Sequence, residues 1–244
     1  MMRLWPTFFS LVLLALAAGS ASLVAPTVSG RIELSPLPGI SSKQAQSRSD
    51  IVIWLKPVHT SGAHSPAPEH LRLLQKDKMF HPHTLAITVG SVVEFPNLDP
   101  IFHNAFSNFD GQLFDVGLYP PGTTRFVHFR KAGIVRVFCN IHPAMSAVIV
   151  VLDTPYFTTA DRDGRYRIAN VPPGAYELHV FDERALNGPE SQVLFTVEGN
   201  EAQVTAPPIH ISETQYLNLA HKNKYGLDYP HSSVDAEPYT GLPK

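Results

Sequence analysis

The residues best suited to chemistry lie in one short stretch, VFCNIHPAM, which contains Cys139, the only cysteine of the chain. His142 follows three residues later and Met145 three residues after that. Thiolate and thioether are soft metal ligands and imidazole is intermediate, so these three residue types together favour copper. Cysteine with two histidines and a weak axial methionine is the ligand set of a type 1 copper site. Such a site requires a second histidine from elsewhere in the chain.

The best candidate for that histidine is His103, in the stretch FPNLDPIFHN, 36 positions before Cys139. It follows a predicted strand and precedes a loop, and the intervening strands can return the chain to the cysteine. Asn104, the next residue, is expected to fasten the two loops together and to offer a backbone N–H to the cysteine sulfur. Such contacts outside the ligand set tune a metal site.

Other interpretations of these residues remain open. A free cysteine most often fills a core, and zinc also binds cysteine and histidine, although methionine is a poor zinc ligand. A dinuclear copper site would need two cysteines. His81 and His83 form an H-x-H pair, but a strand entry and a turn are the more ordinary places for them, and His128 lies in a strand among apolar residues.

The elements that must position the ligands are strands. In a strand over Val135–Cys139, alternation places Val135, Val137 and Cys139 on the core face. The ligand loop then leads into a second strand, Ala147–Leu152. Short alternating segments punctuated by Pro and Gly predict an all-β protein. The other expected strands are Arg31–Leu34, Asp50–Pro57, Leu85–Val89, Val92–Phe95, Arg125–Phe129, Tyr166–Ala169, Tyr176–Phe181, Val193–Val197 and Gln203–Ile209. Only His70–Asp77 (HLRLLQKD) has a helical pattern.

The N-terminus predicts export. Residues 1–21 contain Arg3, the apolar run TFFSLVLLALAA and the small residues GSA, which is the pattern of a signal peptide. No second apolar stretch is long enough to span a bilayer, so we expect a soluble periplasmic protein. A single cysteine in an oxidising compartment is either buried or bound to metal. The net charge of −2 argues against nucleic acid and anionic membranes as partners.

The composition changes near Asp153-Thr154-Pro155, where we predict a domain boundary. The expected units are a copper domain at 22–152, a small β-sandwich at 153–212 and a polar tail at 213–244. Two interpretations of the tail stay open, a disordered segment and an extended arm that lies against the body.

The pattern FPNLDPIFHN followed by GIVRVFCNIHPAM resembles the cupredoxins of the amicyanin and plastocyanin kind, which are Greek-key β-barrels or sandwiches with one type 1 copper. The resemblance covers about Phe80 to Leu152 and implies His103, Cys139 and His142 as equatorial ligands, with Met145 axial. Asn140 and Ile141 within the loop differ from the residues of many relatives.

The stretch TADRDGRYRIANVPPGAYELHVF, residues 159–181, resembles the transthyretin-like β-sandwich of carboxypeptidase regulatory-like domains. The Asp161-x-Asp163-Gly164 ladder lacks the other ligands of a calcium loop, so we expect a tight turn there. The order of a cupredoxin followed by this sandwich is similar to exported chains described as methylamine utilization proteins.

The resemblance implies a one-electron carrier rather than an enzyme. His142, Pro143 and Ala144 would form the docking face, and the partner would be a periplasmic c-type cytochrome or dehydrogenase, met through a small, transient interface. The alternatives are a copper-binding or delivery protein without electron transfer, and a partner- or carbohydrate-binding module with subordinate copper.

Overall fold

The computed structural model describes residues 25–36, 50–59, 67–108, 111–185, 190–199, 201–213 and 221–229. In this part of the chain the regular elements are all strands, which confirms the all-β prediction, and no helix is long and apolar enough to cross a membrane. The predicted signal peptide, residues 1–21, lies outside the described residues.

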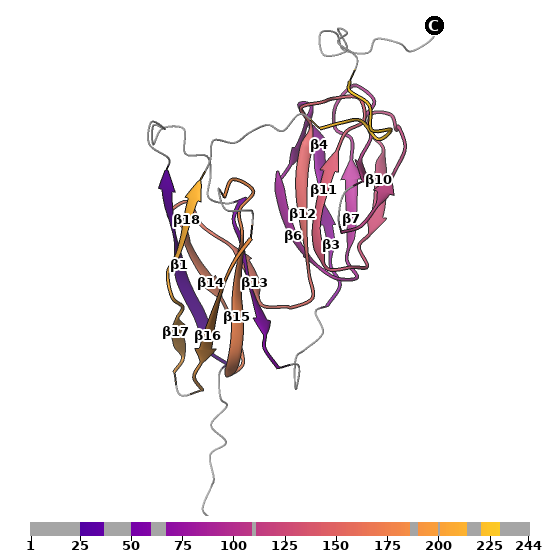
Figure 1. Ribbon diagram of the computed structural model, residues 1–244. Coiled ribbons are helices and arrows are strands. Elements are labelled where there is room, and N and C mark those ends of the chain that lie inside the picture. Colours follow the sequence, from indigo (N-terminus) through magenta and orange to yellow (C-terminus); the bar gives the residue numbers. More distant parts are fainter. Residues whose placement is uncertain are drawn as a thin grey trace, which may run out of the picture.

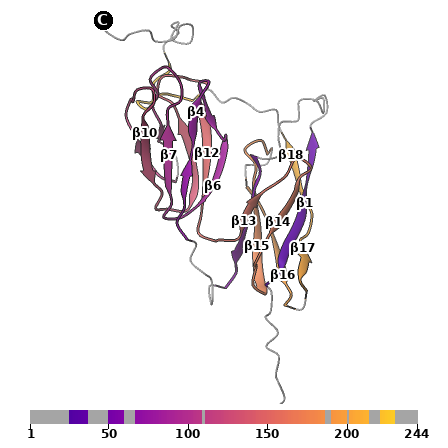
Figure 2. The ribbon, with the colours of Figure 1, turned by 180° about the vertical axis from the view of Figure 1, so that it is seen from behind.

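The strands form two layered bodies that lie side by side (Figures 1 and 2). In the first body, the order β6-β12-β11-β8-β9 makes one sheet and β10-β7-β3 the other, with a separate β4-β5 pair. These described strands form open sheets and no closed barrel. Their bounds are β3 (His70–Arg72), β4 (Leu74–Lys76), β5 (Met79–His81), β6 (Thr84–Thr88), β7 (Val92–Pro96), β8 (Phe106–Ser107), β9 (Phe114–Asp115), β10 (Thr124–His128), β11 (Gly133–Phe138) and β12 (Ser146–Leu152).

The second body also has two sheets. β1 lies between β14 and β17 and also pairs with β18, while the order β13-β2-β15-β16 makes the other sheet. Figure 1 shows indigo β1 beside the late strands β17 and β18. The bounds are β1 (Thr27–Pro36), β2 (Val52–Pro57), β13 (Phe157–Thr159), β14 (Arg165–Ile168), β15 (Gly174–Phe181), β16 (Glu190–Val197), β17 (Gln203–Thr205) and β18 (Ile209–Glu213).

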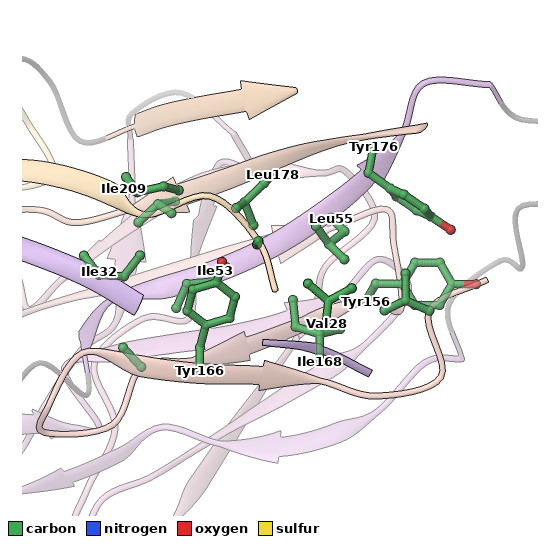
Figure 3. Packing of buried hydrophobic residues seen from close by; sticks show 14 of the residues in the cluster. Val28, Ile32, Ile53, Leu55, Tyr156, Tyr166, Ile168, Tyr176, Leu178 and Ile209 are labelled. Atoms are coloured by element: carbon green, nitrogen blue, oxygen red, sulfur yellow. The ribbon is translucent and has the colours of Figure 1, made fainter. Parts of the chain in front are cut away.

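This pairing differs from the expected grouping of residues 22–152. β1 pairs with β14, β17 and β18, and β2 pairs with β13 and β15, so both early strands belong to the second body. The physical reason is their apolar face: Val28, Ile32, Ile53 and Leu55 are buried with Tyr166, Tyr176 and Leu178 in one core (Figure 3).

The helix expected over His70–Asp77 is wrong, because these residues form β3 and β4. Leu71, Leu73 and Gln75 turn towards the interior while their neighbours are more exposed, which is the period of a strand. Leu73 packs in the core of the first body. Gln75 is also fully buried, and its side-chain amide is hydrogen-bonded to the Asn104 carbonyl and the Tyr119 hydroxyl.

A third apolar cluster joins the two bodies. In β12, Ala147, Ile149 and Val151 face the first core, while Val148, Val150 and Leu152 pack against Val52, Trp54 and Phe181 of the second body. β12 is therefore buried on both faces, as its continuous apolar sequence allows.

Candidate metal centre

The loop that holds three of the expected ligands closes a hairpin. β11 and β12 are antiparallel and end in register at Phe138 and Ser146. Beyond them the Cys139 N–H donates to the Met145 carbonyl at 3.2 Å, and the Met145 N–H donates to the His142 carbonyl at 3.0 Å. The strand alternation continues to Cys139, which packs in the core with Val135 and Val137 as predicted. The hairpin thus brings Cys139, His142 and Met145 to one end of the first body.

His103 reaches the same place from a loop held by other hydrogen bonds. Its N–H donates to the Tyr119 carbonyl and its carbonyl accepts the Tyr119 N–H, at 3.1 and 2.9 Å. The side chain of buried Gln75 accepts a hydrogen bond from the Tyr119 hydroxyl at 2.5 Å and donates to the Asn104 carbonyl at 3.0 Å. Backbone hydrogen bonds with Tyr119 hold His103 itself, and the side chain of Gln75 holds the next residue, Asn104.

Three donor atoms converge. The Cys139 Sγ lies 3.5 Å from Nδ1 of His142 and 3.8 Å from Nδ1 of His103, and the ligand atoms of the three residues all lie within 4.8 Å of one another. Cys139 and His103 are 0% exposed and His142 is 3% exposed. Metal bonds of about 2.0–2.3 Å that meet at about 110–120° separate sulfur and nitrogen by about 3.6–3.8 Å. The observed separations therefore suit one shared metal ion.

Asp99 is a functional residue that the sequence analysis did not identify. Its Oδ2 lies 2.7 Å from Nε2 of His103 and also accepts the Lys78 N–H, while its Oδ1 accepts the Asp77 N–H. Because the carboxylate needs a donor, Nε2 carries the proton and Nδ1 keeps its lone pair, which points towards Cys139. The only sequence signal is the spacing of four residues before His103 in NLDPIFH.

Burial and this hydrogen bond set the charges at the site. Burial lowers the pKa of His103, although the Asp99 carboxylate partly offsets the effect. Burial also opposes the charged form of Asp99, but hydrogen bonds from Lys78, His103 and Asp77 together lower its pKa. The result is a neutral imidazole oriented by an ionised carboxylate.

Burial raises the pKa of the Cys139 thiol, and backbone hydrogen bonds from Ile141, Asn104 and His142 act in the opposite direction. Those N–H groups surround the sulfur as donors, which suits a thiolate held by a metal cation. The backbone of Asn104 is thus one of the donors to the sulfur. Its side chain donates instead to Asp115 at 2.8 Å, so it does not bind the ligand loop directly.

The remaining predicted residues lie as follows. Met145 is fully buried in the core beside Cys139. Pro143 is half-buried and Ala144 exposed, so the expected docking face is open at Ala144 but closed over His142. Among the alternatives, His83 binds Glu183 and the Ser146 carbonyl, and exposed His128 contacts Arg130.

Comparison with known proteins finds partial similarity. No family model matches the chain. It is 38% identical over 60 residues to the methylamine utilization protein MauL of Methylorubrum extorquens, a match that covers 24% of this chain and 53% of that protein. The chain therefore spans about half the length of this curated relative.

Three solved structures are similar to parts of the chain. A purple cupredoxin from Nitrosopumilus maritimus is 23% identical, with 34% of this chain and 99% of that chain covered and a TM-score of 0.31. The Cu-containing nitrite reductase of Thermus scotoductus is 25% identical, with 49% and 28% covered and a TM-score of 0.33. Amicyanin from Paracoccus versutus is 20% identical, with 41% and 97% covered and a TM-score of 0.32.

Proposed function

We propose that this chain is a type 1 copper protein of the cupredoxin kind that carries single electrons. The convergence of the Cys139 sulfur with Nδ1 of His103 and Nδ1 of His142 is the observation that carries the proposal. Met145 is the axial ligand in this proposal. A thiolate, two imidazoles and a thioether are the donors that suit copper, whereas zinc gains little from a thioether. Bound copper would supply a one-electron Cu(II)/Cu(I) couple.

The residues of the chain have three tasks in this function. The β11–β12 hairpin holds Cys139 and His142, and Asp99 orients the His103 ring through Nε2. The apolar core around Met145 excludes water from the ligands. Because these hydrogen bonds and this packing hold the ligand side chains, little rearrangement of the protein accompanies a change in charge at the site.

The partner in this proposal is a periplasmic c-type cytochrome or dehydrogenase that docks near Pro143 and Ala144, and the protein catalyses no reaction of its own. The partial match to a methylamine utilization protein makes cells that use methylamine one setting in which to seek the partner. We also propose that residues 1–21 direct export and that the second body is a carboxypeptidase regulatory-like sandwich.

The test is the visible spectrum of the copper-loaded protein. A Cu(II)–thiolate bond gives an intense absorption at about 600 nm in type 1 sites. We expect this band in the wild type, its complete loss in Cys139→Ser, and its retention with a raised potential in Met145→Leu. Met79→Leu is a matched control, since Met79 is 52% exposed and lies outside the site. Stoichiometric copper binding without the band would refute the assignment.

One observation favours copper delivery without electron transfer as a second candidate. His142, which was expected to form part of the docking face for a redox partner, is only 3% exposed. The rate of copper loss to a chelator and the rate of reduction by a small soluble donor separate the two functions. A carrier keeps its copper and reacts fast with the donor, whereas a delivery protein releases copper readily.

A further inference from the structure

The described part of the C-terminal tail, residues 221–229, lies over the end of the first body that carries the metal site. Figure 1 shows this segment in yellow across that end of the strands. We name it the strap. The strap has its own local structure: the Asn223 side chain accepts the N–H groups of Tyr225 and Leu227, and Gly226 closes the turn with a positive φ of 75°. A segment folded in this way can hold a fixed orientation.

The strap contacts the first two residues of the ligand loop, Cys139 and Asn140. The Tyr229 hydroxyl donates to the carbonyl of Cys139 at 2.7 Å. The N–H of the same cysteine is already bonded to Met145, so Tyr229 satisfies the remaining backbone group of Cys139. The Lys224 N–H donates to the side-chain oxygen of Asn140 at 2.9 Å, and Asn140 lies between two expected ligands in the sequence.

The strap is also connected to the loop of the other histidine. The Lys224 ammonium group binds Asp115 at 2.7 Å, and the other oxygen of Asp115 accepts the side-chain N–H of Asn104. Asn104 directly follows His103. One segment is therefore hydrogen-bonded to both ligand-bearing loops, directly to one and through Asp115 to the other.

An aromatic contact completes the attachment. The ring of His221 stacks on Phe138, the last residue of β11, with centroids 4.1 Å apart and planes 29° apart. The rings of Tyr229 and His221 are nearly perpendicular, with centroids 5.2 Å apart and planes 85° apart. The two ends of the strap therefore meet beside the strand that delivers Cys139.

From these contacts we propose that the strap positions the ligand loop, with Tyr229 and Lys224 as its positioning residues. The proposal rests on the proposed function where it concerns copper. The strap holds the carbonyl of Cys139 and the side chain of Asn140 in place, so that the loop keeps its metal-ready geometry without the metal. It also slows metal release, because the loop must leave the strap before it can open.

The test compares two double variants of the full-length protein. Tyr229→Phe with Lys224→Gln removes the contacts to Cys139 and Asp115, together with the 3.2 Å contact of the Tyr229 hydroxyl with Nδ1 of His221 within the strap. The matched control is Tyr225→Phe with Lys222→Gln, because Tyr225 is 71% exposed and Lys222 forms an exposed contact with Asp228 at 3.9 Å. The phenylalanine keeps the aromatic ring that lies 5.2 Å from the Lys224 ammonium group. Both pairs make the same chemical changes in the same segment.

The first readout is amide hydrogen exchange in the metal-free protein. Loss of one neutral hydrogen bond raises the equilibrium constant for local opening by about fivefold. Loss of an exposed ion pair raises it by a further factor of about one to five. We therefore expect exchange over residues 139–145 to rise by about five- to twenty-five-fold in the strap variant, and by less than about twofold in the control. Unchanged exchange there would overturn the proposal, as would an equal rise in β13–β18, which would show a general loss of stability.

The second readout uses the copper-loaded protein. We expect faster copper transfer to a chelator and a shifted reduction potential in the strap variant only, with Lys224→Gln alone giving a smaller change in the same direction. If the wild type shows no copper–thiolate band while the exchange effect is present, the proposed function fails and the strap stands. If the band is present and neither exchange nor copper release changes, the strap proposal fails and the proposed function stands.

Discussion

Replacing Asp99 with Asn tests the orientation of His103. In the structure the two carboxylate oxygens accept three hydrogen bonds, at 2.6 Å from Asp77, 2.9 Å from Lys78 and 2.7 Å from the histidine ring. The amide of an asparagine has one acceptor and one donor end. Whichever way it turns, its NH₂ group faces at least one N–H group, and the contact with His103 loses its charge.

The magnitude follows from this loss. A charge-assisted hydrogen bond contributes about 1.5–3 kcal/mol and a neutral one about 0.5–1.5 kcal/mol, a difference of about 1–1.5 kcal/mol. Because about 1.36 kcal/mol corresponds to a tenfold change in an equilibrium constant, this difference equals about a five- to thirteen-fold loss of metal affinity. The misplaced amide adds to the loss. Changes around metal-bound histidines typically cost about 10–100-fold, so we expect at least a tenfold loss for Asp99→Asn.

The assay is competition for copper between the protein and a chromophoric chelator, with ring ¹⁵N chemical shifts of His103 to report which nitrogen is protonated in the metal-free protein. Asp161→Asn is the control, because the Asp161 carboxylate also accepts two backbone N–H groups, from Asp163 and Arg165, but touches no histidine. Wild-type affinity in Asp99→Asn, or an equal loss in the control, would refute the reasoning.

Two further predictions concern stability. A Cβ at Gly30 would overlap the hydroxyl oxygen of buried Tyr166 and lie 2.5 Å from the Cζ atom of its ring, so Gly30→Ala should lower the free energy of unfolding by about 1–3 kcal/mol. In a Tyr166→Leu background, which lacks both atoms, the same change should cost less, and an equal cost in thermal unfolding would count against this contact as the cause. Both ring nitrogens of His83 face acceptors, Glu183 Oε2 at 2.7 Å and the Ser146 carbonyl at 3.2 Å, which favours the imidazolium. Burial disfavours that charge, but the contacts with Glu183 and the Ser146 carbonyl and the charge of Asp50 together outweigh it and raise the His83 pKa above 6.5. Its contribution is therefore complete below about pH 6.5 and is lost as the pH rises through the higher folded-state pKa. His83→Gln should remove this fall in denaturant-measured stability between pH 6 and pH 8, and an unchanged pH profile would contradict the assignment.

The ligand loop could be predicted from the sequence because it is local. Cys139, His142 and Met145 lie within one strand–loop–strand unit, where strand alternation and residue type are sufficient. His103 could be predicted only by seeking a second histidine ligand far from Cys139 in the sequence. The structure supports this choice, because it brings the His103 ring to Cys139. Asp99 was missed because its role depends on how the loop turns back on itself, and a carboxylate in a Pro- and Asn-rich loop gives the same sequence signal as an ordinary turn.

Other features could not be predicted for different reasons. Gln75 stands at a core position of β4, so the strand alternation of HLRLLQKD was hidden and the leucine spacing indicated a helix. The partners of β1 and β2 depend on matching faces with strands that follow residue 156, and no local pattern encodes such a choice.

The placement of β1 and β2 has a consequence for the order in which the chain can fold. The second body is discontinuous: its first two strands precede the whole first body in the sequence, and their partners β13–β18 follow it. The first body can therefore fold while Ile51, Ile53 and Leu55 still lack the sheet that buries them. A chain in which only the first body has folded exposes β1 and β2 with unpaired edges, and such edges favour aggregation. The first body is thus inserted between the early and late strands of the second body, as a domain is inserted into a loop of another.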